Sequence, residues 1–208
     1  MLAWLKLTLL WAASGLPPTE FMPKTRAAAQ RALELDERLP EAHTALAVIA
    51  QTYDWDWPTA EKEYRRAIQL NPNYATAHHW YGECLALQGR FDKAFPQIEN
   101  AWQLDPLSLI IATDYGAILY FSRQYDRALE HFRGGLEMEP DLPRAPMLVW
   151  AYAAQKRLFA EALGDAEAYQ RRENAAWSWV MIAYVSGRSG DQAKARLALK
   201  RTGTARTE

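Results

Sequence analysis

The chain has 208 residues, with 24 lysines and arginines against 25 aspartates and glutamates, so its formal net charge at pH 7 is −1. Because nucleic-acid binders usually carry a basic excess, this balance argues against nucleic acid as a partner. Half of the residues are hydrophobic, but no run of about 18 apolar residues predicts a membrane span. The one cysteine, Cys84, cannot form an internal disulfide, which fits a reducing compartment, and we expect it in the core.

The first residues of the chain allow two interpretations. A lysine, a short apolar run and small residues at positions 12–14 imitate a secretory signal. The lysine lies inside the apolar run, however, and the repeats described below use this segment as a helix. We therefore expect a cytoplasmic protein, and a periplasmic or secreted one only if residues 1–14 act as a signal.

Internal repetition with a period of 34 residues is the strongest pattern in the sequence. One proline, one alanine and one large apolar residue recur at this spacing. The recurring positions are Pro72, Pro106 and Pro140; Ala60, Ala94, Ala128 and Ala162; and Tyr64, Ile98 and Phe132. Each proline would end a repeat because proline cannot continue a helix.

Small residues in the pattern predict close helix crossings. Ala47, Gly82 and Gly116 are expected where the two helices of one repeat cross, and the recurring alanines where the second helix meets the next repeat. Larger side chains beside the alanines would fill the remaining space. The pattern therefore predicts stacked helix–turn–helix repeats.

The period and these residues resemble tetratricopeptide repeats over nearly the whole chain. The resemblance implies an all-α fold, a right-handed α-solenoid. Residues 53–67 and 71–81 resemble, more specifically, the carboxy-terminal repeats of bacterial signalling proteins, namely winged-helix regulators, serine/threonine kinases and nucleotide cyclases. None of the motifs of those output domains occurs, so the resemblance implies an architecture and no activity.

The predicted repeats follow in chain order. Residues 1–39 form a partial first repeat, with a short helix over 1–13, a long turn over 14–21 and a second helix over 22–35. Residues 40–74 form a repeat that is one residue longer than 34, because of the turn at 54–57. Residues 75–108 and 109–142 form regular repeats.

The period weakens towards the end of the chain. Residues 143–173 are predicted as a contracted repeat, in a register that places Val149 rather than Trp150 at the small crossing position. Residues 174–203 form a last repeat, and 204–208 a tail. Pro96 should kink its helix or delay its start, because it lies inside the predicted helix 92–104.

Possible chemical sites have simpler structural interpretations. His79 and Glu83 share one helix face, but a metal site needs three or four converging ligands, so we predict packing histidines and no metal or cofactor. Asp56 is expected to cap the following helix, with Trp55 and Trp57 packed beneath it. No catalytic residue is predicted, and the chain is not expected to be an enzyme.

The resemblance implies a ligand groove on the concave face, which the first helices line. Tetratricopeptide relatives use places 2, 5, 9, 12 and 13 of each repeat. On this sequence those places give Thr44, Val48, Gln51, Thr76, His79, Glu83, Thr113, Ala117, Tyr120, Phe121 and Trp150, followed by Ser178 and Ile182. The set is aromatic and weakly polar. The resemblance, together with the absence of any converging chemistry, implies a protein or peptide as the partner. For Phe121 the alternative is packing between repeats.

Three functional hypotheses remain. The leading one is a non-catalytic scaffold that binds a protein or peptide. The second is a detached sensor segment of a larger transcriptional regulator or kinase, suggested by the incomplete first repeat. The third, an enzyme with an unrecognised site, would require perturbed titratable groups bonded to one another in a deep pocket.

Overall fold

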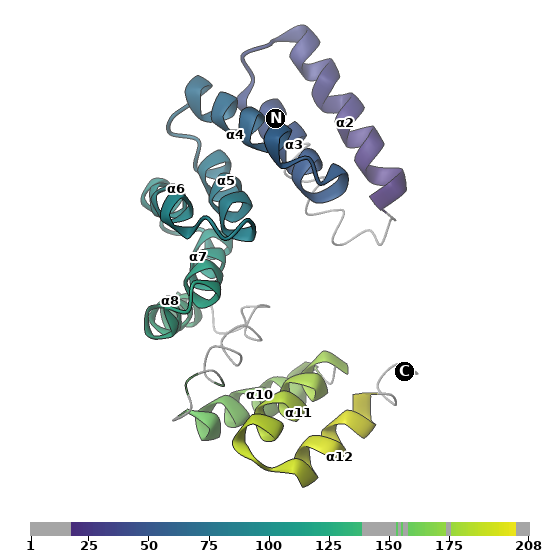
Figure 1. Cartoon of the computed structure of the whole chain (residues 1–208), viewed down its shortest axis with the longest axis vertical. Coiled ribbons are helices and arrows are strands. Elements are labelled where there is room, and N and C mark those ends of the chain that lie inside the picture. Colours follow the sequence, from purple (N-terminus) through teal and green to yellow (C-terminus); the bar gives the residue numbers. More distant parts are fainter. Residues whose placement is uncertain (1–17, 139–152, 154, 156–157, 174–175, 203–208) are drawn as a thin grey trace. The chain divides into compact units, whose positions relative to one another are not determined.

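The computed structural model describes residues 18–138, 153, 155, 158–173 and 176–202. These residues form ten α-helices and one π-helix, and no strand occurs among them (Figure 1). The all-α prediction is confirmed. The chain divides into an amino-terminal body, Met1–Ile111, and a carboxy-terminal body, Ala112–Glu208.

In the amino-terminal body each helix packs on the next one in sequence. The helices are α2 (Pro18–Leu35), α3 (Pro40–Ile49), the π-helix η1 (Ala50–Asp54), α4 (Trp57–Leu70), α5 (Ala75–Leu87) and α6 (Phe91–Leu104). α2 packs on α3, α3 on α4, α4 on α5, and α5 on α6. Short turns between antiparallel neighbours are what helical repeats require.

The carboxy-terminal body contains most of α7 (Leu109–Phe121), then α8 (Tyr125–Met138), α10 (Phe159–Glu173), α11 (Ala176–Ser189) and α12 (Gln192–Thr202). α10 packs on α11, and α11 on α12. The helix predicted over residues 1–13 and the choice between Val149 and Trp150 lie outside the described residues.

Two predicted helix starts need correction. α2 begins at Pro18, so part of the predicted turn over 14–21 is helical; proline suits the first helical position, and Phe21 is buried against Ile49. α6 begins at Phe91, so Pro96 does not delay its start but lies within the helix.

The extra residue of the repeat 40–74 is accommodated in η1. The N–H of Asp56 donates to the carbonyl of Ala50, six residues back, whereas the corresponding bond of the next repeat joins Arg90 to Leu85, five residues back. One wide helical turn therefore accommodates the extra residue.

The residues after η1 match the prediction only in part. Asp56 caps α4, because its carboxylate accepts a bond of 3.1 Å from the N–H of Thr59. Hydrogen bonding from Thr59, through its side chain and its backbone N–H, lowers the pKa of the Asp56 carboxyl. Trp55, however, does not pack beneath α4: it ends η1 in the left-handed region, with a φ of 57°, and its side chain is 70% exposed.

The predicted close crossings are present. A Cβ added to Gly82 would lie 3.1 Å from the backbone nitrogen of Ile98 and 3.4 Å from the carbonyl oxygen of Ala94. A Cβ added to Gly116 would lie 2.6 Å from the ring of Phe132. In each of these two repeats the backbone of the first helix therefore lies directly against the second helix. The contact is with the backbone of the second helix at Gly82 and with the ring of Phe132 at Gly116.

A charged cluster that the sequence did not predict joins two successive repeats. Glu61 of α4 accepts hydrogen bonds from Arg65, from Arg90 at the start of α6, and from the hydroxyl of Tyr81 in α5. Burial raises the pKa of the Glu61 carboxyl, but the hydrogen bond and charge of Arg90, with the charge of Arg65, outweigh this effect and leave that pKa below its usual value.

Ala94→Leu should reduce the free energy of unfolding by roughly 1–3 kcal/mol, because a larger side chain overpacks the crossing beside Gly82. Lys93→Leu, at the adjacent exposed position, should change it by less than about 0.5 kcal/mol. Denaturant unfolding of the full chain measures both values. Equal losses would show that the helix register is wrong.

Glu61→Gln should lower the free energy of unfolding at neutral pH by about 1–2 kcal/mol, because a carboxylate that holds two guanidinium groups becomes a neutral amide. A carboxyl with a lowered folded pKa stabilises above its unfolded pKa and loses this contribution as the pH falls. The difference from the unsubstituted chain should therefore shrink in melts below about pH 4.5, the ordinary pKa of a glutamate. Glu130→Gln, an exposed control on α8, should change the free energy of unfolding by less than about 0.5 kcal/mol at neutral pH.

Candidate partner-binding surface

The predicted groove residues of α3 and η1 are buried. Thr44 donates its hydroxyl to the carbonyl of Pro40 at 2.9 Å, and Val48 lies among the core residues. Gln51 accepts a bond of 2.8 Å from the hydroxyl of Tyr64, while its Nε2 is buried without a hydrogen-bond partner. These side chains join the helices of one repeat and offer little surface in this conformation.

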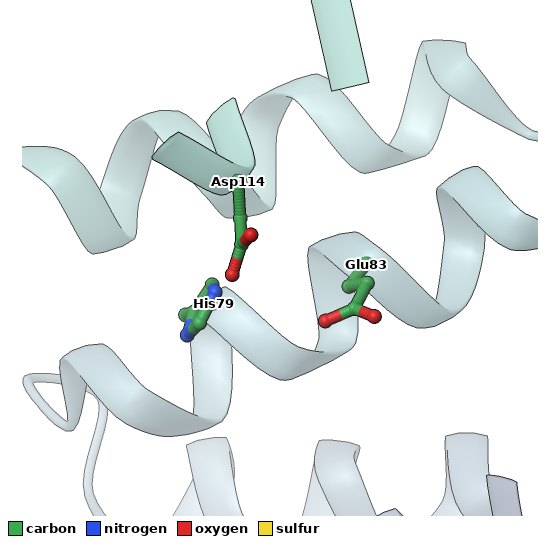
Figure 2. Close-up of side chains that lie close together, drawn as sticks. All are labelled: His79, Glu83 and Asp114. Atoms are coloured by element: carbon green, nitrogen blue, oxygen red, sulfur yellow. The ribbon is translucent and has the colours of Figure 1, made fainter. Parts of the chain in front are cut away.

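On α5 the predicted groove residues are more varied. His79 is buried, whereas Thr76 and Glu83 are partly exposed. His79 and Glu83 lie one helical turn apart on α5 and are side chains of types that can ligate metals (Figure 2). Asp114, the third side chain drawn there, belongs to α7 in the carboxy-terminal body.

The other two histidines of the amino-terminal body have structural roles. His43 and His78, at equivalent places in successive repeats, each bridge the second helix of their repeat and the turn before the first helix. The partners are Glu63 and the carbonyl of Glu37 for His43, and Gln97 and the carbonyl of Pro72 for His78. Both imidazole rings therefore link the helices of their own repeat.

In the carboxy-terminal body the predicted groove residues divide into buried and exposed sets. Thr113, Ala117, Ser178 and Ile182 are buried. Phe121 is 59% exposed, so most of its side chain is not packed between repeats. Trp150 lies outside the described residues.

Tyr120, Phe121 and Tyr125 form an aromatic patch where α7 ends and α8 begins. The ring centroid of Tyr120 lies 5.6 Å from that of Phe121 and 5.4 Å from that of Tyr125. Partial burial raises the pKa of the Tyr120 phenol, and Tyr184 of α11 acts in the same direction. The phenol is therefore neutral near pH 7 and can donate or accept a hydrogen bond.

Place 12 of the sequence pattern led to Tyr120, and place 13 to Phe121. Tyr125 was not predicted, although it is the first residue of the next helix and lies only five positions from Tyr120.

None of the helices in the described part of the chain combines the length and hydrophobicity of a membrane span.

Residues 63–95 match the family model of the tetratricopeptide repeat. The chain is 32% identical over 84 residues to Hsp70-Hsp90 organizing protein 3 of Arabidopsis thaliana, which covers 40% of this chain and 15% of that protein. It is 29% identical over 116 residues to the type IV pilus assembly protein PilF of Pseudomonas aeruginosa, covering 55% of this chain and 46% of PilF. The chain thus spans less than half the length of these relatives.

Solved structures show the same fold over much longer stretches. The structure of Pseudomonas aeruginosa PilF superposes with a TM-score of 0.74 and 22% identity, over 99% of this chain and 92% of PilF. YrrB, described as a TPR protein with an unusual peptide-binding site, superposes with a TM-score of 0.64 and 16% identity, over 87% of this chain and 93% of YrrB. With the 34-residue period, these superpositions show that the chain has the all-α solenoid fold of tetratricopeptide-repeat proteins, and residues 63–95 are the part that matches the repeat's family model.

Proposed function

We propose that the chain is a non-catalytic scaffold that binds a protein or peptide through its first helices. The reactive groups of the amino-terminal body support a structural role. Burial raises the pKa of the Cys84 thiol to about 11, so the thiol is protonated and a poor nucleophile near neutral pH. Burial also raises the pKa of the Tyr64 phenol, which donates to Gln51 in the core.

The exposed ring of Phe121, beside Tyr120 and Tyr125, is the observation that carries the proposal. Aromatic side chains bury a large area with little loss of conformational entropy, and such residues dominate the energy of many interfaces. In this proposal Tyr120 and Phe121 anchor the partner, and Thr113 and Ala117 form the floor beneath it. In the amino-terminal body the proposal keeps Thr76 and Glu83, which are partly exposed, as contact positions, whereas Thr44, Val48, Gln51 and His79 are buried.

Bacterial signalling or regulation, in the cytoplasm, is the proposed setting. Its support is the similarity of residues 53–67 and 71–81 to the repeats of bacterial signalling proteins. Pilus assembly is the second candidate, favoured by the alignment with PilF over 116 residues. Neighbouring genes for kinases, cyclases or winged-helix regulators would support the first setting, and neighbouring pilus genes the second.

Tyr120→Ala should weaken partner binding by about 1 kcal/mol or more, a loss of about fivefold in affinity, and leave the fold intact. The partner is first captured by placing a photo-crosslinking amino acid at position 120 of the full chain, expressed in its own host. Its affinity for the purified chain and variant is then measured by calorimetry. Circular dichroism checks that Tyr120→Ala is folded.

Position 130 provides the matched control, because Glu130 is exposed on α8. A crosslinker there should capture no partner, and Glu130→Ala should bind as tightly as the unsubstituted chain. If crosslinking occurs at 130 and not at 120, or if Glu130→Ala abolishes binding, the partner lies on the second helices and the groove proposal is wrong.

A further inference from the structure

A second concave surface lies over α4, the second helix of its repeat. It is an open depression of about 800 Å³ in the amino-terminal body. Trp57 and Pro58, at the start of α4, line one part of it, and charged and polar side chains of the following turns, with His43 and Gln88, line the rest. None of the predicted groove residues lines this depression, so it is a surface distinct from the groove.

The acidic side chains in the depression already have partners within the protein. Glu61 is bonded to Arg65 and Arg90, and Glu63 lies 2.6 Å from Nδ1 of His43. Their carboxylates are therefore engaged by neighbouring cationic or hydrogen-bonding groups, which reduces their repulsion of an acidic ligand.

Two basic side chains remain. Lys62 and Arg66 are exposed, lie one helical turn apart on α4, and have no ion-pair partner among the described residues. Side chains four residues apart on a helix lie on the same face, so the two cations face the same ligand. The surplus of unpaired charge in the depression is positive, although the chain as a whole has a net charge of −1.

Trp57 gives the same depression an apolar part. Its ring is partly exposed and meets the ring of Trp55 edge to face, with 6.1 Å between centroids. Trp55 is itself largely exposed, and Pro58 follows on the helix. A ligand that fits must combine carboxylates with an aromatic or large apolar side chain.

We propose that this depression is a second docking surface, which binds an acidic peptide segment of a partner protein. Two carboxylates of the segment pair with Lys62 and Arg66, and an adjacent apolar side chain packs on Trp57. A peptide fits better than a nucleic acid because Trp57 is the one indole among the residues that line the depression and offers no series of stacking platforms, and because the chain as a whole has no basic excess.

The test uses the full chain and a fluorescein-labelled nonapeptide that contains four glutamates around one tryptophan. Fluorescence anisotropy at low salt should show saturable binding, which weakens as salt screens the charges. K62E/R66E should reduce the affinity about tenfold or more, because two attractive charges become repulsive. The same peptide with glutamine in place of every glutamate should bind at least about tenfold more weakly.

K24E/K93E is the matched control, since it makes the same change in net charge at exposed positions on α2 and α6. It should bind the acidic peptide within about twofold of the unsubstituted chain. Circular dichroism and thermal melts should be equal for both double variants, so that a loss of binding is not a loss of fold.

Four results would overturn the proposal. They are no binding at millimolar peptide, equal binding by K62E/R66E, equal binding of the glutamine peptide, or tighter binding of nonathymidylate than of the acidic peptide. The variant Tyr120→Ala separates the two surfaces. If it abolishes binding of the acidic peptide and K62E/R66E does not, the peptide occupies the aromatic patch, and the proposal for α4 fails while the groove proposal stands.

Discussion

The closest approach between the two helices of a repeat is the constraint on which the rest of the structure depends. At Gly82 the opposing atoms include the backbone nitrogen of Ile98, which cannot move aside as a flexible side chain can. A larger residue would push α5 away from α6 and open the buried contacts of Ala94 and Ile98. The small residue at this place therefore fixes the separation of the helices, and with it the positions of the neighbouring turns and helix ends.

This constraint explains why much of the fold was predictable from one sequence. Backbone contact permits only glycine or alanine at the crossing, and proline cannot continue a helix. Each requirement therefore makes the same type of residue recur at a fixed spacing in the sequence. The buried positions Ala60, Tyr64 and Ala67 repeat for the same reason. Residue type alone was enough at these positions because a single physical requirement excludes nearly all alternatives.

Other features of the structure could not be predicted, because more than one local structure is compatible with the same sequence. One extra residue in a repeat can lengthen a turn or widen a helix, and only the bond from Asp56 to Ala50 shows that the helix widens. Arg90 is 29 residues from Glu61, and no repeat places a similar pair at the same positions, so periodicity carries no sign of their contact. The left-handed backbone of Trp55 was missed because glycine is the usual residue there, as at Gly89 of the next repeat.

The candidate site was predictable in part, for a related reason. Helical spacing tells which side of a first helix a residue occupies, and it led to Tyr120 and Phe121, whose ring centroids lie 5.6 Å apart. It does not tell how much of that side neighbouring segments cover. Thr44, Val48 and Gln51 occupy groove places and are nevertheless buried, whereas Phe121 is mostly exposed. Exposure depends on side-chain size and on neighbours distant in sequence, and the pattern contains neither.

The two faces of α4 show how such a scaffold can gain a specific partner. Ala60, Tyr64 and Ala67 form a buried stripe that neighbouring helices fix in size and shape. Lys62 and Arg66 lie on the remaining surface, where no packing requirement restricts their type. Because the buried stripe already determines the fold, the exposed stripe can acquire charge at little cost in stability. Lys62 and Arg66, beside a tryptophan ring that is only partly buried, are therefore available to the acidic segment that we propose.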